Sequence, residues 1–400
     1  MALHSINMEK RHMTSINTWT VFASILVVCP LLAVDTGNLA GCTPELTVKT
    51  VKETRREVTV GIVGEALPRC YRDGKPDVDG VIAYWTRAMD GIAAAKPDVF
   101  ILPEISDFGP PITLATKREW AAARGNRILN AYQEYARAHH AYIVYPTYRT
   151  RPDGRFANCA IWIDREGDVV GIYDKYQPTV RDLGHAEFPV VPGTEAIIVQ
   201  TDFGRIGTAI CFDLNFEDIL VKYMKLKPDI IVFPSYFDGG NMRRSWATLC
   251  GSYVIASTVG GLAKTVIGPS GEPIIGDGHP LRTFAVKVNT NFRVLHGDFN
   301  KDALTTALAK YGTRIEVRYP GPLGLMTFLS NDATLPVDEV ISKCGIETWT
   351  RYHDRSIAAR EAALAVPTAR SSAQTARLQT KTADVSERDK SPNSSRLLRP

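Results

Sequence analysis

The hydrophobic residues of this chain follow two spacings, which predict strands and helices in alternation. Residues 58–63 (VTVGIV) alternate and are rich in β-branched side chains, a pattern typical of a strand. Residues 79–96 and 117–139 instead carry apolar side chains at helical spacing. Short apolar segments predict further strands at residues 98–103, 141–145, 157–164, 169–173, 196–200 and 205–210.

The same alternation continues toward residue 290. A helix is expected over residues 214–226, ending before Pro228, and a buried strand over residues 230–233. Strands are then expected at residues 253–258, 264–267 and 284–288. Strands that alternate with helices, with strand pairs between them, indicate an α/β fold built on one large mixed sheet or two. We therefore place one domain at residues 58–290.

The segments on either side of this domain are less regular. Residues 43–57 are polar and predict a linker. From residue 291 to 365 the periodicity weakens, with helical stretches near 301–310 and 337–363, and we treat this part as a C-terminal extension. Residues 366–400 mix Ser, Thr, Arg and Lys, which cannot bury a core, so a disordered tail is expected.

The first 42 residues predict an export signal. An uncharged run at residues 18–34 follows a basic stretch with Lys10 and Arg11, as in secretory signal peptides. The run is marginal for a membrane span. We expect a signal peptide or membrane anchor and a periplasmic, secreted or membrane-anchored protein; a buried core helix is the alternative. Residues 39–42 (LAGC) also resemble the lipobox of bacterial lipoproteins, with Cys42 lipidated, although four residues separate them from the apolar run.

Composition and charge exclude several classes of function. The 400 residues are 44% hydrophobic and 22% charged, with a net charge of +4. The basic excess lies in the tail, so the body is nearly neutral and has no basic stripe typical of nucleic-acid binding. The seven cysteines occur singly, without a Cys-x-x-Cys pair, so neither a zinc site nor a disulfide framework is indicated.

One segment points to nucleophilic chemistry. Residues 204–216 (GRIGTAICFDLNF) place Cys211 where a hydrophobic strand ends and a helix begins. A nucleophile on such a turn is exposed at the sheet edge, and neighbouring backbone N–H groups can face the oxyanion of a substrate. Taken alone, the segment also fits a buried structural cysteine.

A catalytic cysteine needs a base and a cation nearby, because free cysteine is mostly protonated at neutral pH. Glu104 ends the apolar segment VFILPE, where a carboxylate can have a perturbed pKa. Lys175 follows the strand predicted at 169–173, within YDKYQP. Each residue alone would be ordinary, the first as a capping acid and the second as a lysine beside a turn.

Together, the segments ILPE, YDKYQP and GRIGTAICFDLNFED resemble, in this order and spacing, the three catalytic motifs of the nitrilase superfamily of carbon–nitrogen hydrolases. Further similarity lies at residues 156–160 (FANCA), at 192–193 (PG) and at 228–235 (PDIIVFPS). The resemblance extends from about residue 58 to about residue 288, over half the chain.

The resemblance implies a four-layer α-β-β-α sandwich and a set of roles. Cys211 would be the nucleophile, Glu104 the general base and later acid, and Lys175 the cation beside the tetrahedral oxyanion. The backbone N–H of Phe212 would help to form the oxyanion hole. Many members carry a second glutamate that positions the lysine and water, and Glu187 is the matching residue, with an exposed loop acid as the alternative. No metal or organic cofactor is expected.

The resemblance also sets the expected function and its rivals. We expect hydrolysis of a non-peptide carbon–nitrogen bond in a small amide or N-carbamoyl substrate, through a thioester acyl-enzyme. Nitrile hydrolysis, acyl transfer of the apolipoprotein N-acyltransferase kind, and a catalytically silent binding protein on the same fold are the alternatives. A homo-oligomer is expected, but residues 244–253 depart from the Arg-Ala-x-Glu-Asn helix that commonly lines subunit contacts in relatives.

Overall fold

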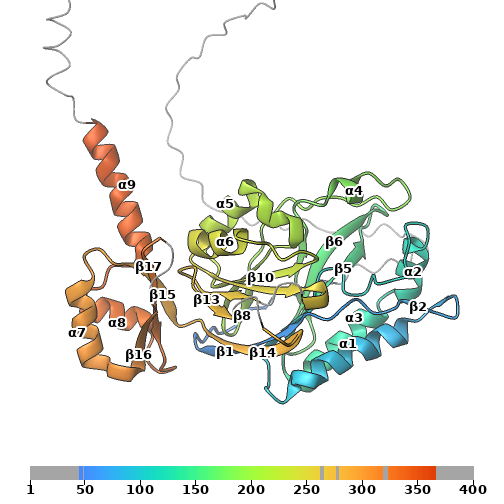
Figure 1. Ribbon diagram of the computed structural model, residues 1–400, viewed down its shortest axis with the longest axis horizontal. Coiled ribbons are helices and arrows are strands. Elements are labelled where there is room, and N and C mark those ends of the chain that lie inside the picture. Colours follow the sequence, from blue (N-terminus) through green and yellow to red (C-terminus); the bar gives the residue numbers. More distant parts are fainter. Residues whose placement is uncertain (1–44, 48, 262–264, 276–278, 319–322, 366–400) are drawn as a thin grey trace, which may run out of the picture. The chain divides into compact units, whose positions relative to one another are not determined.

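Two six-stranded mixed sheets form the centre of the fold in the computed structural model, which describes residues 45–47, 49–261, 265–275, 279–318 and 323–365 (Figure 1). The segments predicted as a signal or anchor (1–42, with Cys42) and as a tail (366–400) lie outside the described residues. Among the described residues, no helix has the length and apolarity needed to cross a membrane.

The first sheet has the strand order β14-β1-β4-β5-β6-β7. Strands β1, β4 and β5 are parallel, and the outer pairings are antiparallel. The central strand β4 is buried throughout, which explains its continuous apolar sequence. In chain order, the strands are β1 (Glu57–Val63), β4 (Val99–Ile101), β5 (Tyr142–Thr150), β6 (Phe156–Ile163), β7 (Val169–Asp174) and β14 (Thr283–Asn289).

The second sheet has the strand order β13-β12-β11-β10-β9-β8. Its centre is parallel as well, since β10 pairs in parallel with both β9 and β11. The strands are β8 (Val199–Thr201), β9 (Gly204–Thr208), β10 (Ile230–Ser235), β11 (Tyr253–Thr258), β12 (Val266–Ile267) and β13 (Pro273–Ile275).

The two sheets pack face to face, and helices cover their outer faces. Val60 and Ile101 of the first sheet share one buried cluster with Ile206, Val232 and Ile255 of the second. Helices α1 (Val78–Ala93), α2 (Lys117–Arg124) and α3 (Arg127–His139) cover the first sheet, and α5 (Glu217–Leu226) and α6 (Met242–Cys250) cover the second. The four-layer α-β-β-α sandwich implied by the resemblance is therefore confirmed.

One predicted helix is divided. The sequence predicts a single helix over residues 117–139, but the structure has α2 and α3 with a break at Gly125 and Asn126. Gly125 has a φ of 47°, which ends α2 and turns the chain. Helix α3 then buries Ile128, Tyr132 and Tyr135, spaced at about one helical turn, against the sheet.

The C-terminal extension contains strands that the sequence did not indicate. A three-stranded sheet has the order β15-β17-β16, with β15 (Phe292–His296), β16 (Ile315–Arg318) and β17 (Leu325–Ser330). Helices α7 (Lys301–Tyr311), α8 (Val337–Cys344) and α9 (Trp349–Ala365) accompany it. The remaining elements are short: β2 (Tyr71–Arg72), β3 (Lys75–Pro76), α4 (Val180–Leu183), η1 (Cys211–Asn215), η2 (Val259–Gly261) and η3 (Gly312–Arg314).

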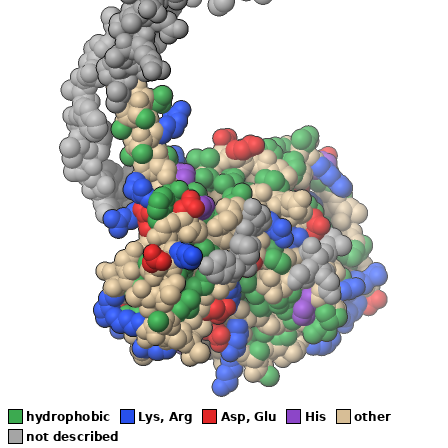
Figure 2. Space-filling model, turned by 60° about the vertical axis from the view of Figure 1, so that its left-hand side comes forward, with side chains coloured by type: hydrophobic (Ala, Val, Ile, Leu, Met, Phe, Trp, Pro, Cys, Tyr) green, Lys and Arg blue, Asp and Glu red, His purple; other side chains and the backbone are tan. Residues whose placement is uncertain are grey.

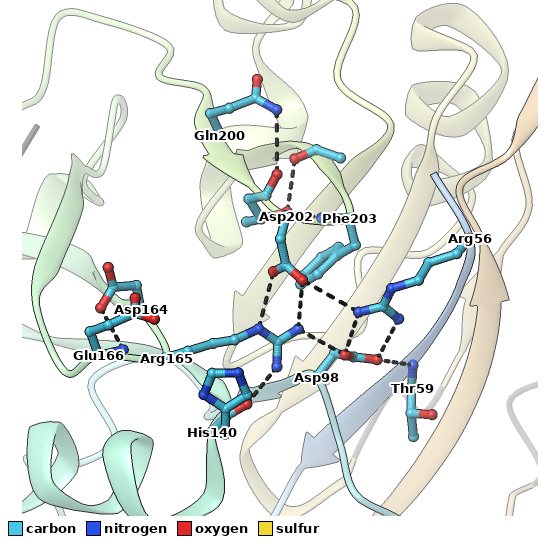
Figure 3. Close-up of polar contacts among 12 residues, drawn as sticks. Arg56, Thr59, Asp98, His140, Asp164, Arg165, Glu166, Gln200, Asp202 and Phe203 are labelled. Atoms are coloured by element: carbon cyan, nitrogen blue, oxygen red, sulfur yellow. Dashed lines mark hydrogen bonds and ion pairs between the residues drawn. The ribbon is translucent and has the colours of Figure 1, made fainter. Parts of the chain in front are cut away.

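A network of charged side chains links the two sheets near the start of β4 and the β8–β9 turn (Figure 3). Arg165, in the β6–β7 turn, donates to Asp98 at 2.8 Å and to Asp202, in the β8–β9 turn, at 3.1 Å. Arg56, from the polar segment before β1, also donates to Asp98 at 2.8 Å. Since Asp98 precedes β4 and Glu104 follows it, this network and Glu104 lie at opposite ends of that strand.

Acidic and basic side chains are interspersed on the face drawn in Figure 2. Lys and Arg side chains (blue) lie among Asp and Glu side chains (red) there, without one dominant patch of either sign. The surface of this face therefore offers no extended field of a single charge.

Candidate active site

Three residues predicted from the sequence meet where strands of both sheets end. Glu104 follows β4, Lys175 follows β7, and Cys211 follows β9 at the start of η1. The Nζ of Lys175 lies 2.7 Å from Oε1 of Glu104, and the two residues are only 1% and 3% exposed. Cys211 is half-buried and lies close enough for both charges to act on its thiol.

Three donors fix the carboxylate of Glu104. Oε1 accepts hydrogen bonds from Nζ of Lys175 and from Nδ2 of Asn158, the latter at 2.8 Å. Oε2 accepts from the backbone N–H of Tyr236 at 3.1 Å. Because one donor lies within β6 and the other two follow β7 and β10, the carboxylate is held in one orientation.

Lys175 is held as an ammonium ion in spite of its burial. Burial alone lowers the pKa of Lys175, but the charges of Glu104 and Cys211 and the hydrogen bond to Glu104 raise this pKa above its ordinary value. A buried cation of this kind can stabilise negative charge that develops beside it.

The thiol of Cys211 is protonated in the resting state. Burial and the charge of Glu104 raise its pKa to about 11, while Lys175 and hydrogen bonds from Ser235 and the Tyr236 backbone act in the opposite direction. Cys211 also has a φ of 49°, in the left-handed region that a residue other than glycine seldom occupies. Such strain is typical of a nucleophile on a tight strand-to-helix turn.

Asp213 organises the turn that carries Cys211. Its buried carboxylate accepts from the backbone N–H of Ile210 at 2.9 Å, from the backbone N–H of Gln177 at 2.7 Å and from the hydroxyl of Tyr173 at 2.7 Å. Burial raises the pKa of Asp213 to about 6, although these donors and Lys175 lower it. The turn before Phe212 is thereby joined to the segment after Lys175.

Two further residues were predicted to belong to the site: Phe212 is adjacent to Cys211, whereas Glu187 is exposed. Phe212 follows Cys211 within η1, and its ring packs edge-on against Phe216 at 5.1 Å. The side chain of Glu187 is exposed, and only its backbone carbonyl takes part in a described hydrogen bond, which it accepts from Arg118. The structure therefore does not bring Glu187 to the other three residues, and its role stays a prediction.

Sequence reasoning gave no role to Asn158, Asp213 or Tyr236. The first two lie in segments that the sequence did single out, FANCA and ICFD, but neither motif alone shows which acceptor or donor its polar residue meets. The contribution of Tyr236 is a backbone N–H, which no sequence pattern reports. Within the described part of the chain, no group of three or more His, Cys, Asp or Glu residues could hold a metal ion.

Comparison with known proteins relates this site to a family. Residues 60–257 match the model of the family described as carbon-nitrogen hydrolase. The chain is 23% identical over 185 residues to the nitrilase and fragile histidine triad fusion protein NitFhit of Drosophila melanogaster, which covers 45% of this chain and 40% of that protein. It is 25% identical over 130 residues to the deaminated glutathione amidase of Mus musculus, covering 31% and 40%.

Other similarities are local or distant. A pantetheinase of Canis lupus familiaris is 30% identical over 125 residues, which is 29% of this chain and 24% of that protein. An amidase from Nesterenkonia sp. has a similar structure, with 16% identity, a TM-score of 0.48 and coverage of 60% of this chain and 91% of that one. The chain thus spans about 40% of the length of each of the first two relatives named above.

Proposed function

Because residues 60–257 of this chain are a carbon–nitrogen hydrolase domain of the nitrilase superfamily, we propose that it hydrolyses a small amide or N-carbamoyl substrate with Cys211 as nucleophile. The observation that carries this proposal is the buried Glu104–Lys175 ion pair beside a cysteine with a left-handed backbone. A base, a cation and a nucleophile are the groups that covalent acyl transfer requires.

The reaction would proceed in two halves. Glu104 takes the thiol proton as Sγ of Cys211 attacks the carbonyl carbon, and the tetrahedral oxyanion forms beside the ammonium of Lys175. Glu104 then gives the proton to the leaving nitrogen. Ammonia leaves the tetrahedral intermediate, and a thioester remains on Cys211. Water attacks the thioester with Glu104 again as base, which releases the carboxylic acid and restores the thiol.

The raised thiol pKa supports this order of events. A thiol with a pKa of about 11 is almost entirely protonated at neutral pH, so attack needs a base at the moment of bond formation. Glu104 is the carboxylate whose charge acts most strongly on this thiol. The lysine charge matters most later, when negative charge reaches the carbonyl oxygen.

Relatives favour amides among the possible substrates. Deaminated glutathione amidase and an amidase are among the similar proteins, and their names specify amide hydrolysis. Nitrile hydrolysis, acyl transfer and silent binding remain outcomes of the same experiment.

The test is ammonia release from primary amides, N-carbamoyl amino acids and nitriles, incubated with the purified chain. We expect turnover of an amide or carbamoyl compound and its abolition in Cys211→Ala. Cys344→Ala, which changes a half-buried thiol on α8, is the matched control and should retain activity. Undiminished turnover in Cys211→Ala would falsify the assignment of the nucleophile.

Export and self-association are proposed on other grounds. Residues 18–34 and the basic stretch before them support export, which fractionation of cells that express the full chain would test. Full-length protein recovered entirely from the cytosol would contradict it.

A homo-oligomer is proposed by analogy with the family, and light scattering of the purified chain would measure its mass.

A further inference from the structure

The residue that follows Glu104 has a strained backbone. Ile105 has a φ of 42°, in the left-handed region. A side chain branched at Cβ rarely adopts this conformation, because its Cβ atom crowds the following carbonyl oxygen. Such a conformation persists only where the surrounding structure holds it, and it is typical of functional sites. Neighbouring contacts must therefore hold Ile105 in place.

The turn that contains Ile105, residues 104–107, is anchored in its middle to β5 and α1. Ser106 donates twice to the backbone carbonyl of Pro146 in β5, from its N–H at 2.9 Å and from its hydroxyl at 3.0 Å. The carbonyl of Ser106 accepts from the indole N–H of Trp85 in α1 at 2.8 Å. Since Ser106 is fully buried, water does not compete for these partners.

The last residue of the turn, Asp107, meets three donors. Its Oδ1 accepts from the hydroxyl of Thr147 at 2.7 Å. Its Oδ2 accepts from the hydroxyl of Tyr145 at 2.7 Å and from Nη1 of Arg124 at 2.8 Å. The two hydroxyls belong to β5, and Arg124 is the last residue of α2. Because Asp107 is also fully buried, its carboxylate fixes the end of the turn to both elements.

Arg124 completes this anchor because it contacts β5 as well. Its Nη2 donates to the backbone carbonyl of Tyr148 at 2.9 Å, and its Nη1 also donates to the hydroxyl of Thr147. Burial lowers the pKa of Arg124, but the charge of Asp107 raises this pKa above its ordinary value. When one partner of a buried ion pair is lost, the other charge is left uncompensated. Neither charge can therefore be removed without disturbing the turn.

We propose that Asp107 and Arg124 are positioning residues for the catalytic base, Glu104. The pair holds the residue after the base in its left-handed conformation and thereby fixes the direction of the carboxylate. This inference rests on the proposed function. Without the pair, Ile105 can relax to an ordinary conformation, and its rotation moves the adjacent Glu104. A displacement of about 1 Å at a reacting group can cost ~10²-fold in rate.

Replacing Ile105 by glycine tests this inference, because glycine adopts a left-handed conformation without strain. In Arg124→Met, kcat should fall ~10²-fold, since the strained turn relaxes. In Arg124→Met/Ile105→Gly, kcat should recover at least ~10-fold, because the turn no longer has strain to relieve. Lys227→Gly is the matched control in the same background. Lys227 is exposed after α5 with a φ of 52°, so its replacement relieves similar strain but should not restore kcat.

Iodoacetamide labelling of Cys211 is a second readout that does not need turnover. Burial and the charge of Glu104 raise the pKa of this thiol, so a displaced carboxylate should shift the labelling profile of Arg124→Met to lower pH. Ile105→Gly should reverse this shift. If no amide is hydrolysed, the proposed function fails, and the labelling profile still decides the role of the pair.

Several results would overturn this inference. They are undiminished kcat or an unchanged labelling profile in Arg124→Met, and a recovery with Ile105→Gly that is no larger than the recovery with Lys227→Gly. If Arg124→Met does not fold, Arg124→Lys takes its place, because it keeps the buried charge but cannot reach all three acceptors. Its smaller loss of kcat should be reversed by Ile105→Gly and not by Lys227→Gly, and any other pattern would show that the pair is only structural.

Discussion

At the residue scale, the buried ion pair between Glu104 and Lys175 shapes the chemistry of Cys211. Removing two charges from water is costly, and their mutual attraction offsets this only when the geometry is good. Here the 2.7 Å contact and the donors from Asn158 and Tyr236 satisfy the carboxylate. The two charges act on the thiol in opposite directions, so their removal should have opposite effects on it.

Neutral variants of Glu104 and Lys175 should therefore shift the pKa of the Cys211 thiol in opposite directions. Glu104→Gln should lower the pKa of the Cys211 thiol, because a nearby negative charge disappears while the ammonium remains. Lys175→Met should raise this pKa for the opposite reason. Both variants should lose activity, since one lacks the base and the other lacks an oxyanion donor that contributes ~10²–10³ in rate. The measurement is the pH dependence of iodoacetamide labelling at Cys211, beside kcat.

Cys250→Ala is the control for the labelling, because that cysteine is buried in α6. Shifts of the same sign in Glu104→Gln and Lys175→Met would mean that the variants change the fold around the thiol. An unchanged profile and unchanged kcat in Lys175→Met would make the lysine structural.

The sequence predicts the ion pair better than its surroundings. Glu104 and Lys175 stand in short motifs at strand ends, so local sequence is enough to single them out. Asn158 reaches Glu104 from a strand 54 residues away, and Tyr236 does so through its backbone. The prediction for Glu187 rests on its position in the chain alone, and position does not determine where a loop directs a side chain.

At the scale of elements, Asp213 links the end of β9 to the segment after β7. Its carboxylate accepts three hydrogen bonds, from Ile210, Gln177 and Tyr173. Only the ionised form can accept from all three without donating a proton of its own. The turn that positions Cys211 therefore depends on the charge state of one buried acid.

This dependence predicts an acidic limit of activity. With a pKa of about 6, Asp213 is ionised above that pH and becomes protonated as the pH falls through it. Protonation makes one carboxyl oxygen a donor, so one of the three partners loses its acceptor, and kcat should fall below about pH 6. Asp213→Asn should be less active, with no inflection in this range. The measurement is kcat from pH 5 to pH 8 in both proteins.

A matched variant separates the effect of protonating Asp213 from a general effect of acid on the protein. Asp182→Asn alters another carboxylate, which accepts from the hydroxyls of Tyr148 and Thr179. It should retain the inflection. Loss of the inflection in Asp182→Asn, or its persistence in Asp213→Asn, would assign the acidic limit to a different group.

Strands with a strong local pattern match their predicted positions, whereas the strands of the C-terminal extension were not predicted. Strands β1, β5, β6, β7 and β11 lie within a few residues of their predicted bounds, because each combines strong periodicity with a clear turn. Strand β15 pairs with β17, and α7, η3 and β16 lie between them. Such short strands have a weak local signal, and the three-stranded sheet is therefore specified mainly by contacts that form on folding.

At the scale of the whole chain, the C-terminal extension shares the core of the hydrolase domain. Phe292 of β15 and Leu329 of β17 belong to the buried cluster that lies between the two large sheets. The ring of Phe292 packs edge-on against Tyr253 of β11 at 5.2 Å. Asn289, at the end of β14, donates from Nδ2 to the backbone of Ser330 at 2.8 Å. The boundary predicted at residue 290 therefore does not coincide with a break in packing.

This shared core predicts that the extension and the domain unfold as one unit. Phe292→Ala removes a ring that is 4% exposed and should lower the free energy of unfolding by about 3–5 kcal/mol. Phe299→Ala is the matched control, because that ring is 77% exposed and its loss should cost less than about 1 kcal/mol. The measurement is urea unfolding followed by tryptophan fluorescence and by residual activity. Because Trp349 begins α9 while Trp85, Trp162 and Trp246 report on the sandwich, coincident transitions are expected in both variants. Two separate transitions in Phe292→Ala, with activity retained after the first, would show instead that the extension is an independent domain.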